Sequence, residues 1–194
     1  MIVVRYADDA VVGFQHRAEA ERFLEELRCR LAEFGLELHP DKTRLIEFGR
    51  FAESNRRRRG DGKPETFNFL GFTHISGKTQ KGWFTVLRQT IRSRLRAKLH
   101  EVKEALRRRM HAPIPETGSW LASVIRGHFQ YYGVPGNQPA LSTFRLAITR
   151  MWRQILLRRS QTARIPWQRM ARLVKRWFPT VRLYHPYPNQ RLVV

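Results

Sequence analysis

The sequence predicts an α+β fold, with a mixed first half followed by an all-helical second half. Two patterns indicate this. Short β-rich runs surround one amphipathic helix up to about residue 89, and apolar residues recur at helical spacing from residue 90 onward. The 194 residues are 42% apolar, which is enough for a packed core in one sizeable domain or two small ones.

The first expected element is a β-hairpin. Apolar runs at residues 2–6 and 11–14 flank Ala7-Asp8-Asp9-Ala10, which places two carboxylates at the tip. Adjacent carboxylates on rigid strands present the hard oxygen ligands that Mg²⁺ prefers, and polymerases use a pair of such ions. The alternative is that the aspartates only fill a turn, because Asp is a common turn residue.

The rest of the first half is expected to be one helix and two further strand pairs. Apolar residues recur at helical spacing over residues 18–34, and Gly35 stands where a C-terminal cap belongs. Residues 36–38 and 43–48 are predicted as strands around the turn His39-Pro40-Asp41. The polar stretch 50–64 has neither period and is predicted as an exposed loop. Residues 67–73 and 83–87 are predicted as a strand pair around a turn at 77–82.

The second half is predicted to be helical. A first helix from residue 90 carries an apolar stripe with a 4-4-3-4-4 spacing, and Pro113-Ile114-Pro115 ends it. Ser119 can cap a helix over 120–132. Further stripes predict helices around 141–155 and 167–177, and the Pro-rich residues 179–194 are expected to be an extended tail. The first stripe consists of Ile91, Leu95, Leu99, Val102, Leu106 and Met110.

Charge is unevenly distributed along the chain. The formal net charge of +21 comes from 37 Lys and Arg against 16 Asp and Glu. Residues 1–89 carry 16 basic and 13 acidic side chains, a net of +3, whereas residues 90–194 carry 21 and 3, a net of +18. Such an excess predicts a polyanionic partner, and nucleic acid is the leading candidate. The preference for Arg, 30 against 7 Lys, suits RNA, although a GC-rich genome gives the same bias.

Several other classes of protein are disfavoured. A single cysteine, Cys29, excludes an internal disulfide and a Cys-based zinc site, and it fits an intracellular protein. The seven histidines show no paired His or Cys spacing for zinc. No apolar run reaches about 18 residues, so no membrane span is expected. The charged residues after Met1-Ile2-Val3-Val4 argue against a signal peptide.

Four motifs in order resemble the group II intron reverse transcriptase and maturase family. Tyr6-Ala7-Asp8-Asp9 is similar to the catalytic signature, and Gly35-Leu36-Glu37-Leu38-His39-Pro40-Asp41-Lys42-Thr43 to the block that follows it. Phe69-Leu70-Gly71-Phe72 resembles the primer-grip block, and residues 125–133 resemble the signature of the maturase-specific domain. The resemblance implies a partial reverse-transcriptase palm at residues 1–89, an all-α thumb and maturase domain at 90–178, and a tail at 179–194.

The resemblance also implies roles for residues of the first half. Asp8 and Asp9 would be catalytic Mg²⁺ ligands, and Tyr6 would lie near the primer end or the incoming nucleotide. Lys42 would lie near the departing phosphates, with an ordinary surface lysine as the alternative. Leu70 and Gly71 would position the primer strand, the alternative being a buried strand with an incidental glycine.

In the second half, the first helix would be the thumb helix along template and primer. A run of charged residues usually marks a helix face that is exposed to water, but very few acidic residues balance the basic residues of this one. Seven aromatic residues could stack on bases, yet most fall on apolar stripes, which favours core packing: Trp120, Phe129, Tyr131, Tyr132, Trp152, Trp167 and Trp177. For Arg126 and His128 a hydrogen-bonded structural role is an open alternative. The candidate nucleic-acid contacts are Arg92, Arg94, Arg96, Lys98, Lys103, Arg107, Arg108, Arg109, Arg126 and His128.

The chain departs from the family in lacking the third metal-binding aspartate and the fingers, which the resemblance places upstream of Met1. We therefore expect that the chain alone does not polymerise. It is expected either to be one piece of a polymerase and maturase whose upstream polypeptide supplies the missing parts, or a non-catalytic RNA-binding remnant. A weaker alternative is an unrelated Arg-rich nucleic-acid binder. Expected partners are structured group II intron RNA and RNA/DNA primer-template, in a cytoplasmic ribonucleoprotein.

Overall fold

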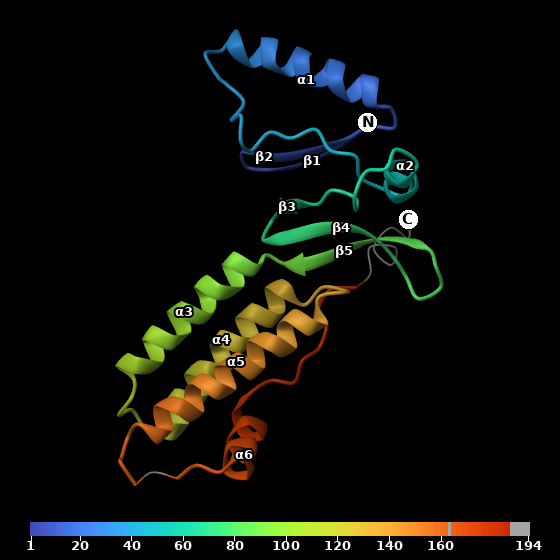
Figure 1. Cartoon of the computed structure of the whole chain (residues 1–194). Coiled ribbons are helices and arrows are strands. Elements are labelled where there is room, and N and C mark those ends of the chain that lie inside the picture. Colours follow the sequence, from blue (N-terminus) through green and yellow to red (C-terminus); the bar gives the residue numbers. More distant parts are fainter. Residues whose placement is uncertain (163, 187–194) are drawn as a thin grey trace.

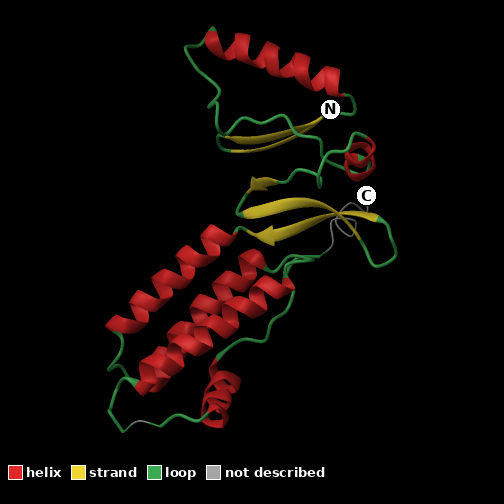
Figure 2. Cartoon of the chain, in the orientation of Figure 1, coloured by secondary structure: helices red, strands yellow, loops and turns green. Residues whose placement is uncertain are grey.

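The computed structural model describes residues 1–162 and 164–186, and it confirms the predicted α+β fold. Two small antiparallel sheets with helices α1 and α2 precede a group of four helices (Figures 1 and 2). The strands are β1 (Ile2–Tyr6), β2 (Asp9–Gly13), β3 (Phe67–Phe69), β4 (Phe72–Lys78) and β5 (Phe84–Thr90). The helices are α1 (Arg17–Ala32), α2 (Ala52–Arg58), α3 (Arg92–Arg108), α4 (Ile114–Tyr132), α5 (Gln138–Leu157) and α6 (Trp167–Trp177).

The first sheet is the predicted hairpin of β1 and β2. Its register runs from Ile2 opposite Gly13 to Tyr6 opposite Asp9, which leaves Ala7 and Asp8 as a two-residue turn. Both strands are rich in β-branched residues, as expected for a sheet buried on both faces. In this structure, however, the outer edge of each strand has no partner among the described residues. Several of its large apolar side chains are exposed: Ile2, Val3, Val4 and Tyr6.

The second sheet has the order β3-β4-β5 and lies between the hairpin and the helices (Figure 1). Leu70 and Gly71 form the turn between β3 and β4. Strand β5 ends at Thr90, and α3 begins two residues later, so the sheet leads directly into the helical half.

The main core lies among the four C-terminal helices. Apolar stripes on α3, α4 and α5, which run side by side in Figure 1, meet in it. Helix α6 closes one end, where the Trp177 ring lies so near Gly118 of α4 that an added Cβ would approach it to 2.7 Å. The side chains with no exposed surface are Leu106, Leu121, Ile125, Phe129, Leu141, Phe144, Ile148, Trp152 and Met170. The stripes predicted from spacing are therefore the buried faces.

Three predicted elements are wrong. Residues 36–48 form no strand, since nothing in the described parts of the chain pairs with them. The predicted loop 50–64 contains α2, which buries Ala52 and is fixed by Asn55 and Arg59 bonding to Glu47. The side chain of Glu47 has a lowered pKa because Arg59 and Asn55 donate to it.

Two boundaries also differ from the prediction. Helix α4 begins at Ile114 rather than Trp120, because Pro115 is tolerated in a first turn, where amide hydrogens have no helical partner. Residues 70–71 form a turn and not part of one strand over 67–73. Residues 179–186 have no regular secondary structure, and the backbone amides of Tyr184 and His185 donate to the Gly133 carbonyl. The rest of the predicted tail lies outside the described residues.

Candidate catalytic hairpin and nucleic-acid interface

The two aspartates lie at the tip of the β1–β2 hairpin. Asp8 is in the turn, and Asp9 is the first residue of β2. Ala7 has a φ of 53°, a left-handed conformation that is costly for an L-residue with a side chain. Both carboxylates are exposed, and neither makes a hydrogen bond or ion pair within the described residues. They are free to accept a cation.

Tyr6 lies directly opposite Asp9 in the hairpin register. Directly opposed residues project their side chains from the same face of a sheet, so the phenol and this carboxylate share a face. The Tyr6 side chain is 65% exposed. The face that carries Asp9 thus offers an aromatic surface beside a carboxylate.

The donor set at the tip suits Mg²⁺ in part. Carboxylate oxygens are its preferred ligands, and Mg²⁺ is often held by one or two carboxylates together with substrate phosphates. No cluster of three or more His, Cys, Asp or Glu side chains suited to a metal occurs within residues 1–162 and 164–186. The hairpin therefore provides two carboxylates, and further ligands would have to come from outside it.

Lys42 lies in the turn at residues 40–42, where its amide donates to the His39 carbonyl. Its side chain is exposed. Within the described chain no ion pair joins it to Asp8 or Asp9. Its expected position near the departing phosphates stays a prediction.

The Leu70–Gly71 turn is held by the helical half. Leu70 has a φ of 47° and Gly71 a φ of 80°, so both are left-handed. The Tyr131 hydroxyl donates to the Leu70 carbonyl at 2.9 Å, and the Ile91 amide donates to the Gly71 carbonyl at 3.1 Å. An added Cβ at Gly71 would lie 3.1 Å from the Tyr132 hydroxyl. The glycine is therefore not incidental: backbone and neighbours both require it.

The basic residues of α3 lie on two flanks of the helix. Residues spaced by four or seven positions share a face, so Arg92, Arg96, Lys103 and Arg107 line one flank, while Arg94 and Lys98 line another. Two of these six cations are paired with acids of their own helix: Lys98 with Glu101, and Arg107 with Glu104. The predicted single basic face is thus divided in two.

The flank with Arg94 and Lys98 faces α4 across a groove of about 390 Å³. Tyr131 and His128 line the same groove from α4. Tyr131 is 51% exposed and stacks on Phe72 with 6.0 Å between ring centroids, so one aromatic face belongs to the core and part of the ring is open. The groove combines cations with an accessible aromatic ring.

His128 is buried and does not present an accessible imidazole nitrogen Nε2. Its ring stacks on Phe144 with centroids 3.7 Å apart, and Nε2 has no hydrogen-bond partner among the described residues. Burial, with a smaller effect of Lys98, lowers its pKa to about 4. This geometry favours a packing role for His128 over a direct contact with RNA.

The other candidate cations differ in whether they pack against another side chain of the protein. The Arg109 guanidinium lies 4.5 Å from the centre of the Trp120 ring, a packed position between α3 and α4. Arg126 and Arg108 are exposed and have no ion pair in the described parts of the chain. These two remain available to an anionic partner.

The aromatic residues mostly pack, as the sequence indicated. Trp152 and Phe129 are fully buried, and Trp120, Tyr132 and Trp177 are partly buried against the core. Tyr131 and Trp167 are the exceptions: Tyr131 is 51% exposed, and Trp167 is 53% exposed with Arg153 lying 4.6 Å from its ring centre.

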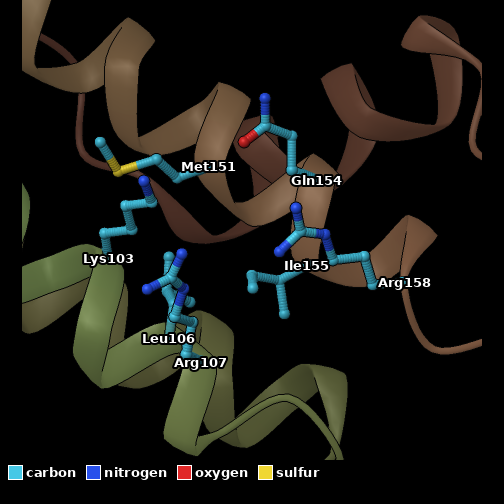
Figure 3. Close-up of a pocket in the computed structure, with 7 residues that line it drawn as sticks. All are labelled: Lys103, Leu106, Arg107, Met151, Gln154, Ile155 and Arg158. Atoms are coloured by element: carbon cyan, nitrogen blue, oxygen red, sulfur yellow. The ribbon is translucent and has the colours of Figure 1, made fainter.

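Sequence reasoning missed two polar residues, Gln154 of α5 and Arg158, which caps the C-terminus of that helix. They line a cavity together with Lys103 and Arg107 of α3 (Figure 3). The spacing Arg150, Gln154, Arg158 places these residues on one flank of α5 and could have indicated them.

A comparison with known families found a match to the first part of the chain. Residues 1–74 match the family model described as reverse transcriptase (RNA-dependent DNA polymerase). These residues are reverse-transcriptase-like. A search of curated proteins found no match to the chain. The reverse-transcriptase-like segment contains the candidate residues of the first half, Tyr6, Asp8, Asp9, Lys42, Leu70 and Gly71, and it ends within β4.

The helices beyond the reverse-transcriptase-like segment carry most of the positive charge. Among the described residues, no helix is long and apolar enough to cross a membrane. The reverse-transcriptase-like segment contacts the helical half at the Leu70–Gly71 turn, through Tyr131 and Ile91, and at the adjacent Phe72, whose ring packs on Tyr131 and Tyr132.

Proposed function

We propose that this chain is the C-terminal portion of a group II intron-encoded RNA-directed DNA polymerase and maturase. In this proposal the basic helices bind structured intron RNA and primer-template, and the hairpin contributes two of the three aspartates that hold Mg²⁺. The observation that carries it is the exposed, unpartnered Asp8-Asp9 pair at a β-hairpin tip inside the segment that matches reverse transcriptases.

Asp8 and Asp9 would hold the metal. Bound Mg²⁺ supplies activation of the primer hydroxyl and stabilises charge on the departing phosphates. The strands of the hairpin fix the spacing of the carboxylates, and Tyr6, opposite Asp9, places an aromatic surface on the same face. The Leu70–Gly71 turn, anchored by Tyr131, would hold the primer strand at a set distance from the helices.

A polypeptide that supplies the fingers and the rest of the palm is the partner this proposal requires. Its support is the state of the β1–β2 hairpin, in which apolar side chains on both faces are exposed, including Ile2 and Val3. Two-stranded sheets are marginally stable in water unless a further strand or layer covers them. A neighbouring palm strand would pair with a free edge of the hairpin and bring the third aspartate close to Asp8 and Asp9, and the other layers of the palm would cover these faces.

Primer extension on an RNA template with Mg²⁺ tests the catalytic part. The full chain is assayed alone and together with a fragment that carries fingers and front palm. We expect product only in the mixture and its loss on Asp9→Asn, with Asp61→Asn, which changes an exposed aspartate away from the hairpin, as the matched control. Activity that survives Asp9→Asn would contradict the catalytic role.

The second candidate is a non-catalytic RNA-binding protein that acts only in splicing or RNA folding. It is favoured by one observation: the described chain offers only two clustered carboxylates for metal. A mixture that binds RNA tightly but never extends a primer would support it. Filter binding of the full chain to structured RNA at about 50 and 200 mM salt tests the RNA-binding role common to both candidates, because a phosphate-driven interaction weakens steeply with salt.

A further inference from the structure

A small cavity lies between α3 and α5 (Figure 3). Its α3 residues lie on the flank of the helix opposite those that line the Tyr131 groove. Two apolar residues, Leu106 and Ile155, are almost fully buried and form part of its wall. Polar side chains from both helices surround them. Among the described residues, its lining consists of Lys103, Leu106 and Arg107 from α3, Met151, Gln154 and Ile155 from α5, and Arg158, which directly follows α5.

The charge of this cavity is unbalanced. Of the residues that the structure describes, three cations line it and no carboxylate does. Glu104 pairs with Arg107 at 2.7 Å, but Lys103 and Arg158 make no ion pair within residues 1–162 and 164–186. Like charges held close together repel, and an anion between them relieves that repulsion. The lining therefore favours the binding of an anionic group.

The size and donors of the cavity fit a phosphate. Its volume of about 80 Å³ exceeds the roughly 10–15 Å³ that a cavity needs to hold one water molecule. No aromatic side chain of the described residues lines it. Arg107 and Arg158 offer planar forked donors, Lys103 a compact charge, and Gln154 an amide N–H. These are the donors that bind phosphate oxygens.

Further cations lie next to the cavity on both helices. Arg96 lies on the flank of α3 that carries Lys103, and Arg150 lies one turn before Gln154 on α5. Both are exposed. A strand of nucleic acid with one phosphate in the cavity would meet further cations in either direction, whereas a free phosphate ion would use only the cavity.

We propose that the α3–α5 cavity is a binding site for a single backbone phosphate of RNA, shared by Lys103 and Arg158 with Arg107 and Gln154. This rests on the proposed RNA-binding function of the helical half and gives it a specific site. The site joins two helices, so it would also favour one relative position of α3 and α5 when RNA is bound.

A double-mutant cycle in the full chain tests whether Lys103 and Arg158 share one phosphate. An RNA hairpin is titrated with wild type, Lys103→Gln, Arg158→Gln and the double variant at several salt concentrations. Each single change should weaken binding roughly three- to tenfold. The double variant should lose much less than the product of the two factors, and it should lower the slope of log K against log salt by only about 0.7–0.9, the value of one phosphate.

Arg172→Gln provides the matched control, because Arg172 is an exposed arginine of α6 away from the cavity. Its effect should multiply with that of Lys103→Gln. Thermal unfolding of every variant checks folding. If the wild type binds RNA but Lys103→Gln and Arg158→Gln bind equally well, or if their effects multiply, the shared site is wrong while the RNA-binding function stands.

A test with inorganic phosphate distinguishes a site for an RNA phosphate from a site for a free phosphate ion. Thermal unfolding of the wild type is measured in phosphate and in chloride of equal ionic strength. One outcome would overturn both the RNA assignment and the proposed function. In it, millimolar phosphate protects the wild type against thermal unfolding, Lys103→Gln abolishes this protection, and the chain does not bind the RNA hairpin. We expect little protection by phosphate, together with RNA-binding losses of Lys103→Gln and Arg158→Gln that do not multiply in the double variant.

Discussion

The Tyr131 hydroxyl donates a 2.9 Å hydrogen bond to the carbonyl oxygen of Leu70, 61 residues earlier in the chain. The neighbouring Gly71 carbonyl accepts from the Ile91 amide at the start of α3. The last turn of α4 and the first residue before α3 therefore hold the two carbonyls of one turn. These two bonds help to fix the second sheet to the helices.

Tyr131→Phe should lower the free energy of unfolding by about 0.5–1.5 kcal/mol, because it removes one hydrogen bond while the ring keeps its stack on Phe72. Urea unfolding followed by circular dichroism measures it. Tyr6→Phe is the control, since the exposed Tyr6 hydroxyl has no partner in the described residues. Equal stability of Tyr131→Phe and wild type would contradict a role for this bond.

Gly71→Ala and Gly82→Ala separate backbone strain from crowding. Both glycines have a φ of 80°, but no atom of the described residues lies within 4 Å of an added Cβ at Gly82, whereas the Tyr132 hydroxyl lies 3.1 Å from one at Gly71. Gly82→Ala should cost about 1 kcal/mol from the left-handed backbone alone. Gly71→Ala should cost roughly 1–3 kcal/mol more from crowding. Thermal unfolding compares them, and equal losses would mean that Tyr132 moves away freely.

Asn137→Ala should be among the most damaging single changes. The buried Asn137 side chain accepts from the Thr90 amide at 2.9 Å and donates to the Thr90 hydroxyl and the Tyr132 carbonyl, each at 2.8 Å. Its removal leaves buried polar groups without partners, so about 2–4 kcal/mol should be lost. Urea unfolding gives the value.

Asn68→Ala is the matched control for Asn137, because the exposed Asn68 accepts a single bond, from Thr73. It should cost less than about 1 kcal/mol. Thr90→Val, which removes one of the three bonds, should fall between the two variants. A loss at Asn137 no larger than that at Asn68 would show that the junction of β5 with the α4–α5 turn does not depend on this side chain.

The helices were predictable because their stripes contain enough periods to fix which face is buried. Ile91 to Met110 gives six apolar positions, and α3 follows them. The hairpin was predictable for a similar reason, since two apolar runs flank a short acidic turn. Residues 36–48 were not, because a strand needs a partner as well as a pattern, and the described chain supplies none.

The candidate site was predictable where a motif is contiguous and unpredictable where two helices meet. Asp8 and Asp9 were found at the tip of a hairpin because their neighbours define both strands. The burial of His128 depends on Phe144, which is distant in sequence. Likewise, the meeting of Lys103 with Arg158 depends on how α3 packs on α5, which spacing along one helix does not specify.

His128 should make stability fall as the solution becomes acidic. Its ring is buried against Phe144, and burial with a contribution from Lys98 lowers its pKa from 6.5 to about 4. As pH falls below about 6.5, the unfolded chain takes up a proton that the folded chain excludes, so the free energy of unfolding decreases until about pH 4 and then levels off. The total loss from this group is roughly 3 kcal/mol.

His128→Phe removes this titration while keeping an aromatic ring against Phe144, and it also removes the unpartnered Nε2. Urea unfolding at several pH values between about 7.5 and 4.5 should therefore show a shallower pH dependence than wild type. Part of the slope should remain, because burial also lowers the pKa of His74. His111→Phe, a matched change at an exposed histidine, should keep the wild-type slope. If His128→Phe keeps it too, protonation of His128 does not limit stability, and its ring must reach solvent more easily than its packing indicates.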